Sequence, residues 1–107
     1  MKTIPTTTLA VLAMIALGAA VPAHASPELA RSKNCVACHA VDKKMVGPAY
    51  KDVADKYRND KNTENMLVQK VIKGSRGTWG SIPMPPNAHV TDAEAHMLVK
   101  WILSGAE

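Results

Sequence analysis

Apolar residues recur at helical spacing in separate segments of the chain. Tyr50, Val53 and Tyr57 follow one another by three and four positions, which predicts a helix over residues 49–57 with these side chains on one face. A shorter segment, residues 27–34, begins with proline, a residue suited to the first turn of a helix. Both segments are short, so each needs packing partners elsewhere in the chain.

Capping residues delimit two further helices. Asn62 or Thr63 is suited to cap a helix over residues 64–73. Thr91-Asp92-Ala93-Glu94 is a capping box, and it predicts a final helix that ends near Ser104. No segment alternates in the manner of a strand, so the pattern predicts an all-α fold of about four short helices.

The connection between the last two helices, residues 74–90, contains three glycines and three prolines and cannot form a regular element. A loop of this length is usually functional or disordered. Trp79 in its middle and the sequence Ile82-Pro83-Met84-Pro85-Pro86 after it favour a functional loop.

The N-terminal part has the composition of an export signal. Lys2 precedes an apolar run of 13 residues, Leu9 to Val21, and Ala23-His24-Ala25 has the form of a cleavage site. The run is shorter than the roughly 20 residues that span a bilayer. We therefore expect a cleaved secretory signal peptide at 1–25 and a single domain at 26–107, with an uncleaved anchor as the alternative.

The sequence Cys35-Val36-Ala37-Cys38-His39 is the pattern of covalent c-type haem (heme c) attachment. Two thiols add across two vinyl groups, and the following histidine can bind the iron as proximal ligand. A thioredoxin-like site would need a βαβ setting, and a structural zinc site would need a second pair of ligands. A disulfide between Cys35 and Cys38 would close too small a loop to stabilise the domain.

Composition supports a core built around a cofactor. The chain has no Phe, two Trp and two Tyr, so it has few large side chains for a core of its own, and small domains often need a metal or cofactor. Without Lys2, twelve Lys and Arg stand against nine Asp and Glu. This balance is too weak for a general nucleic-acid binder, although a local group of lysines can steer an acidic partner.

Met84 is the expected second axial ligand of the haem iron. The prolines beside it fix backbone angles and so lower the entropy cost of holding a weak thioether ligand in place. His89 is the main alternative, because iron with two histidine ligands also occurs. The remaining candidates are expected to pack or to lie at the surface: Met45 against the ring, Met66 and Met97 by packing, and His96 by exposure.

Several residues have expected supporting roles around the haem. The Pro48 carbonyl can accept the second ring N–H of His39, although Pro48 is equally explained as a helix opener. The indole N–H of Trp79 can bind a propionate or simply be packed. Lys70 and Arg76 can neutralise propionates or be ordinary surface charges.

With these motifs in place, residues 26–107 resemble the small bacterial class I monohaem cytochromes c of the cytochrome c-551 type. The resemblance rests on the haem motif and on four further stretches: Met45 to Ala54, Trp79-Gly80, Ile82 to Asn87, and Lys100 to Ser104.

The resemblance implies a compact all-α fold around one haem, with the first and last helices crossing. It also implies that His39 and Met84 are axial ligands, that the Pro48 carbonyl is bonded to His39, and that Trp79 is bonded to a propionate. Lys70 stands where the family has a basic residue near the propionates, and His89 is an additional residue before the last helix.

The expected function is therefore that of a soluble, monomeric, periplasmic one-electron carrier and not an enzyme. It would serve transient redox partners of a respiratory chain, for example a nitrite reductase or a terminal oxidase, through a haem edge surrounded by lysines such as Lys33, Lys43 and Lys44. Two alternatives remain at this point: an enzyme or sensor with an open iron site, and a haem module tethered by its N-terminus.

Overall fold

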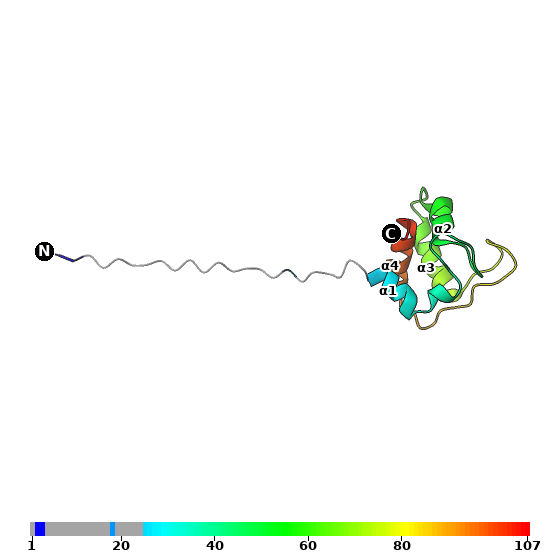
Figure 1. Ribbon diagram of the computed structural model, residues 1–107, viewed down its shortest axis with the longest axis horizontal. Helices are drawn as coiled ribbons and strands as arrows, with labels where there is room; N and C mark the ends of the chain where they lie inside the picture. Colours follow the sequence, from blue (N-terminus) through cyan, green and yellow to red (C-terminus); the bar gives the residue numbers. More distant parts are fainter. Residues whose placement is uncertain (1, 4–17, 19–24) are drawn as a thin grey trace.

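The computed structural model describes residues 2, 3, 18 and 25–107. The predicted export signal, residues 1–25, lies almost entirely outside them. The described chain folds into four α-helices and one turn of 3-10 helix, arranged as in Figure 1: α1 Ala25–Ser32, η1 Cys35–Ala37, α2 Tyr50–Tyr57, α3 Thr63–Lys73 and α4 Asp92–Leu103. Within these residues the extended structure is limited to an isolated β-bridge between Ser75 and Met84, so the all-α prediction is confirmed.

The predicted helix boundaries are accurate to within two residues, and the largest error is informative. The first helix ends at Ser32 because Asn34 adopts a left-handed conformation, with φ 68° and ψ 17°. Asparagine tolerates this region better than most residues with a Cβ. The turn redirects the chain from α1 into η1, which begins at Cys35.

The capping box predicted before the last helix is present. The Thr91 hydroxyl accepts a hydrogen bond from the Glu94 N–H (3.1 Å), and the Glu94 carboxylate accepts one from the Thr91 N–H (3.0 Å). The bond from the Thr91 backbone, with a further contribution from the Lys33 ammonium, lowers the pKa of Glu94. By contrast, Asn62 occupies the N-cap position of α3 but its side chain makes no capping bond.

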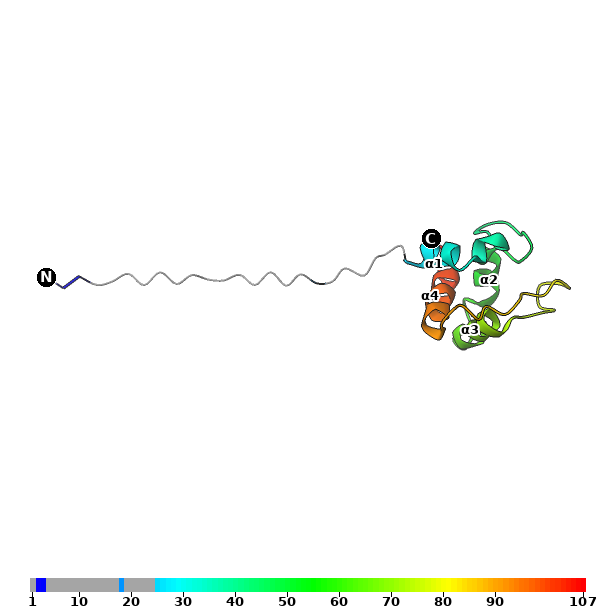
Figure 2. The same cartoon turned by 90° about the horizontal axis from the view of Figure 1, so that it is seen from below.

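The hydrophobic core is formed by α1, α3 and α4 together with Val90. Ala30 on α1 is only 1% exposed, and Figure 2 shows α1 lying across α4. A small side chain at such a crossing lets two helix backbones approach closely. The expected crossing of the first and last helices is therefore present.

Two methionines expected to pack in the core are instead at the surface. Met66 on α3 is 39% exposed and Met97 on α4 is 42% exposed. Helical spacing alone assigns a residue to a face, but here the buried faces are set by Leu67 and Val68 on α3 and by Leu98 and Val99 on α4. None of the helices in the described part of the chain is long and apolar enough to cross a membrane.

Candidate haem-binding site

A cavity of about 360 Å³ lies between two loops and the helices α2, α3 and α4. Figure 2 shows the loop after η1 and the loop after α3 extending to the same side of the helices. The lining contains the residues expected from the sequence to attach the haem, to ligate its iron or to surround it: Cys35, Cys38, His39, Pro48, Lys70, Arg76, Trp79 and Met84. Helical side chains such as Val71 and Leu98 give the cavity apolar walls.

The ring of His39 is held in one tautomer. Its Nδ1 lies 2.8 Å from the Pro48 carbonyl oxygen. Because a carbonyl can only accept, Nδ1 must carry the proton and donate it, which leaves the Nε2 lone pair available for a metal. Such a bond also fixes the ring orientation, as in other histidine-ligated metal sites.

Gly47 is packed against the same ring. A Cβ at this position would lie 2.5 Å from His39 Cε1 and 2.9 Å from Nδ1. No side chain larger than hydrogen can therefore occupy position 47 without moving the histidine. The glycine before Pro48 is required by close approach of the ring.

Tyr50 supports His39 from another side, a contribution that the sequence analysis did not identify. The two rings are nearly parallel, with centroids 5.4 Å apart and an interplanar angle of 20°, and Trp101 contacts Tyr50 edge-on at 5.2 Å. Burial raises the pKa of the Tyr50 hydroxyl well above its usual range, so it stays protonated. The position of Tyr50, two residues after Pro48 and on the buried face of α2, is the signal that could have suggested this role.

Both cysteines lie at the cavity wall. Cys35 and Cys38 are each partly buried, and η1 begins at Cys35. Burial, together with the neighbouring Cys38, raises the pKa of the Cys35 thiol. The two cysteines are not joined to each other.

Met84 reaches the cavity from the opposite loop. Its backbone N–H donates to the Ser75 carbonyl (2.7 Å), and the Ser75 N–H donates to the Met84 carbonyl (3.0 Å), which forms the isolated β-bridge. Gly74 makes this approach possible: it has φ +82°, and a Cβ there would lie 2.7 Å from the Met84 carbonyl oxygen. A glycine thus lies beside each candidate ligand segment.

The cavity separates the candidates for a second axial ligand. Of the six considered from the sequence, only Met45 and Met84 line it. His89 is instead hydrogen-bonded to the Lys33 carbonyl (3.1 Å). His96, expected to be exposed, is partly buried, and its Nδ1 lies 2.8 Å from a Glu64 carboxylate oxygen.

Two lysines, one from α2 and one from α3, lie beside the loop that carries Trp79. Lys70 donates to the Thr78 hydroxyl at 3.1 Å, and the Lys56 ammonium lies 5.6 Å from the centroid of the Trp79 ring. Trp79 itself is 38% exposed at the cavity wall. Lys56, which also lies over Tyr57, was not identified from the sequence.

Comparison with known proteins identifies the family. The family model for cytochrome c matches residues 23–106. The chain belongs to the cytochrome c family. It is 59% identical to cytochrome c-551 of Pseudomonas aeruginosa over 76 residues, which cover 71% of this chain and 72% of that protein. It is 46% identical to cytochrome c-552 of Nitrosomonas europaea over 104 residues, which cover 97% and 98% of the two chains.

Solved structures agree with the cytochrome c assignment. The crystal structure of wild-type Nitrosomonas europaea cytochrome c552 superposes with a TM-score of 0.71 at 50% identity, covering 73% of this chain and 96% of that one. The class 1 cytochrome MtoD of Sideroxydans lithotrophicus superposes with a TM-score of 0.64 at 36% identity, covering 82% and 100%. The fold is therefore that of a small class I cytochrome c.

Cytochromes c carry one covalently bound c-type haem and act as electron carriers, not as enzymes, and this chain is one of them. The residues at the cavity fit that group. The donor set comprises two free thiols separated by two residues, an imidazole with an available Nε2, and a thioether on the opposite loop. When bound, the haem supplies an iron that alternates between ferrous and ferric states.

The contact between Gly47 and His39 gives a direct test. In Gly47→Ala the new methyl group must displace the His39 ring, so we expect the Nδ1–H to lose its bond to the Pro48 carbonyl and the holoprotein to be destabilised by about 2 kcal/mol. NMR of the His39 Nδ1–H and denaturant unfolding measure the two effects.

Gly77→Ala is the matched control for this substitution. A Cβ at Gly77 contacts nothing within 4 Å, so only its backbone conformation, φ +87°, is strained. The control should lose some stability and keep the wild-type Nδ1–H resonance. An unchanged resonance in Gly47→Ala would show that the ring does not depend on this glycine.

Proposed function

We propose that this cytochrome c is a periplasmic one-electron carrier whose haem is held by Cys35 and Cys38 and whose iron is ligated by His39 and Met84. The observation that carries the proposal is the single cavity that both thiols, His39 and Met84 line together. The hydrogen bond from His39 Nδ1 to Pro48 leaves Nε2 as the ligating atom. No second function is favoured by the geometry.

The thiols and His39 form the proximal attachment. Cys35 and Cys38 would hold the haem through two thioether bonds, one to each of its vinyl groups. The Pro48 carbonyl keeps His39 in the ligating tautomer, and Tyr50 packs against the ring. Little of this half needs to move during electron transfer.

Met84 provides the distal ligand. Pro83, Pro85 and Pro86 restrict its backbone, and the bridge to Ser75 fixes it from the other side. The soft thioether favours ferrous iron and therefore raises the reduction potential. Met45 is the less suitable candidate because it lies six residues after His39, within the proximal loop.

Trp79 and Lys70 are assigned to the propionate side of the cavity. Lys70 brings a positive charge to the wall but cannot make the bidentate contact of an arginine. Lys56, held over the Trp79 ring, adds a second charge nearby. These residues would offset the two propionate charges. Lys70→Gln removes one positive charge, so the pKa of the propionates should rise in this variant.

The surface around the cavity suits brief docking of a redox partner. Apolar side chains are exposed there, among them Val46 (51%) and Ile82 (65%), and the exposed Lys43 and Lys44 lie in the same loop as Val46. Lys33 does not belong to this group, because its ammonium is bonded to Glu94 and to the His89 carbonyl. A small, partly charged contact is typical of weak electron-transfer complexes.

Met84→Ala tests the ligation. The ferric wild-type holoprotein should show a charge-transfer band from sulfur to iron, and the variant should lose it. Its reduction potential should also fall by about 0.1 V or more, within the roughly 0.8 V over which axial ligands set haem potentials. Absorption spectroscopy and potentiometry measure these changes.

Met45→Ala is the control, because Met45 also lines the cavity. It should keep the band. A wild-type protein without the band would contradict Met84 ligation. Carbon monoxide and cyanide would then distinguish an open site, which binds rapidly, from a second protein ligand such as His89, which resists.

Charge reversal at Lys44 tests the docking surface. With hexacyanoferrate(III) as an anionic one-electron oxidant of the ferrous protein, Lys44→Glu should lower the second-order rate constant by about threefold at low ionic strength. The difference should disappear near 1 M salt, where the Debye length is about 3 Å. Lys61→Glu, away from the cavity lining, should change the rate much less, and equal effects of the two variants would argue against a local surface.

The location and the maturation of the chain are tested together. Mass spectrometry of the holoprotein from a periplasmic extract should give the mass of residues 26–107 plus one haem. Recovery of the intact N-terminus in the membrane fraction would instead support the tethered module.

A further inference from the structure

We propose that Lys33 and His89 form a clamp that keeps the Met84 segment closed against the haem-attachment segment, so that both are positioning residues for the Met84 ligand. This inference rests on the proposed ligation by Met84. It gives a role to His89, the additional residue before the last helix.

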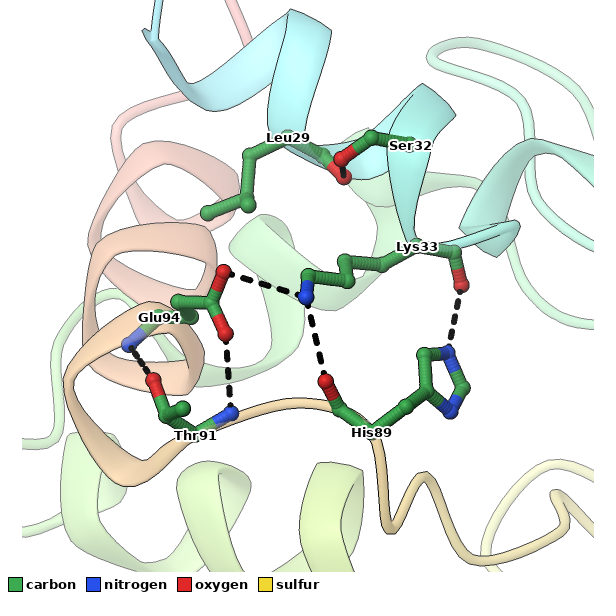
Figure 3. A network of polar contacts seen from close by, with 6 residues as sticks. All are labelled: Leu29, Ser32, Lys33, His89, Thr91 and Glu94. Carbon is green, nitrogen blue, oxygen red and sulfur yellow. Dashed lines mark hydrogen bonds and ion pairs between the residues drawn. The ribbon is translucent and has the colours of Figure 1, made fainter.

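The clamp is reciprocal, as Figure 3 shows. His89 Nε2 donates to the Lys33 carbonyl at 3.1 Å, while the Lys33 ammonium donates to the His89 carbonyl, also at 3.1 Å. Each residue thus uses its side chain to bind the backbone of the other across a separation of 56 positions. Such a pair fixes both the distance and the orientation of the two chain segments.

A third residue joins the clamp to the start of α4. The Lys33 ammonium lies 3.2 Å from the Glu94 carboxylate. This carboxylate also accepts the hydrogen bond from the Thr91 N–H in the capping box. The Lys33 ammonium therefore contacts both the segment before α4, at His89, and the first turn of α4, at Glu94. Its side chain is only 23% exposed, so the contacts are partly shielded from solvent.

The clamp lies at the ends of the two ligand-bearing segments. Lys33 is two residues before Cys35, and His89 is five residues after Met84. Between Met84 and His89, the fixed φ angles of Pro85 and Pro86 limit how far the two residues can move independently.

The Met84 segment has another attachment, to α3. The Asn87 N–H lies 3.3 and 3.2 Å from the carbonyls of Val71 and Ile72, and the Asn87 side chain donates to Val71 (2.8 Å). Asn87 thus holds the segment to α3, and the clamp holds it to the end of α1. Loss of the clamp would leave one of these two attachments and make local opening of the Met84 segment easier.

Cyanide binding to the ferric holoprotein measures this opening. Cyanide must displace Met84, so at saturating cyanide the rate reports how often the segment opens. Removal of a hydrogen bond that exists only in the closed state should raise the rate about fivefold to tenfold in His89→Ala. Lys33→Met, which keeps the Lys33 carbonyl but removes the ammonium, should raise it by a similar factor.

His96→Ala is the matched control. His96 is also a histidine with one long-range hydrogen bond, to Glu64 across α3 and α4, but it contacts neither ligand segment. It should lower the unfolding midpoint comparably while changing the cyanide rate by less than about twofold. His89→Gln, whose amide can still donate to the Lys33 carbonyl, should return the rate to within about twofold of wild type.

Two results would overturn the clamp: an unchanged rate in His89→Ala, or an equal acceleration in His96→Ala. Failure of the ligation itself would appear separately, as a missing sulfur charge-transfer band in the wild type. The clamp is then judged by hydrogen exchange of the Met84 and Ser75 amides, which close the β-bridge. Faster exchange in His89→Ala than in His96→Ala supports it, and equal exchange overturns it.

Discussion

The hydrogen bond from His39 to the Pro48 carbonyl is the interaction on which the site depends. It fixes the tautomer and the orientation of the His39 ring. Further backbone hydrogen bonds join the chain around His39 to the chain around Pro48. The Gly47 N–H donates to the Cys38 carbonyl at 2.8 Å, and the Tyr50 N–H donates to the Ala40 carbonyl at 3.0 Å. The haem motif, the following loop and the start of α2 therefore form one rigid unit, in which Gly47 must be glycine because the ring lies against it.

The Met84 side of the cavity is held less firmly. Its loop has one backbone bridge, to Ser75, with Asn87 and His89 as later attachments. A weak thioether ligand on a loop held at few points is more easily displaced than an imidazole held by a hydrogen bond and a stacked ring. Under the proposed ligation by His39 and Met84, small changes in the attachments of the Met84 loop can adjust the reduction potential without disturbing the His39 side.

Local features of the sequence were sufficient for much of this structure. The Thr91–Glu94 capping box and the glycine- and proline-rich loop each act over a few residues and predicted their elements correctly. The haem motif, equally local, predicted the cofactor of the family. The end of α1 was misplaced because it depends on a left-handed Asn34, which helical periodicity does not reveal. Met66 and Met97 were misassigned because a face is buried only where another helix or the cavity covers it.

The Lys33–His89 pair shows a different limit. From the sequence, Lys33 was expected among the docking lysines and His89 was the main alternative to Met84 as an iron ligand. The two residues are 56 positions apart in the sequence. They meet because α1 and α4 cross, which brings the Lys33 side chain at the end of α1 to the chain before α4. The helix crossing that buries Ala30 thus also determines how the Met84 loop is anchored, and it links the hydrophobic core to the distal side of the site.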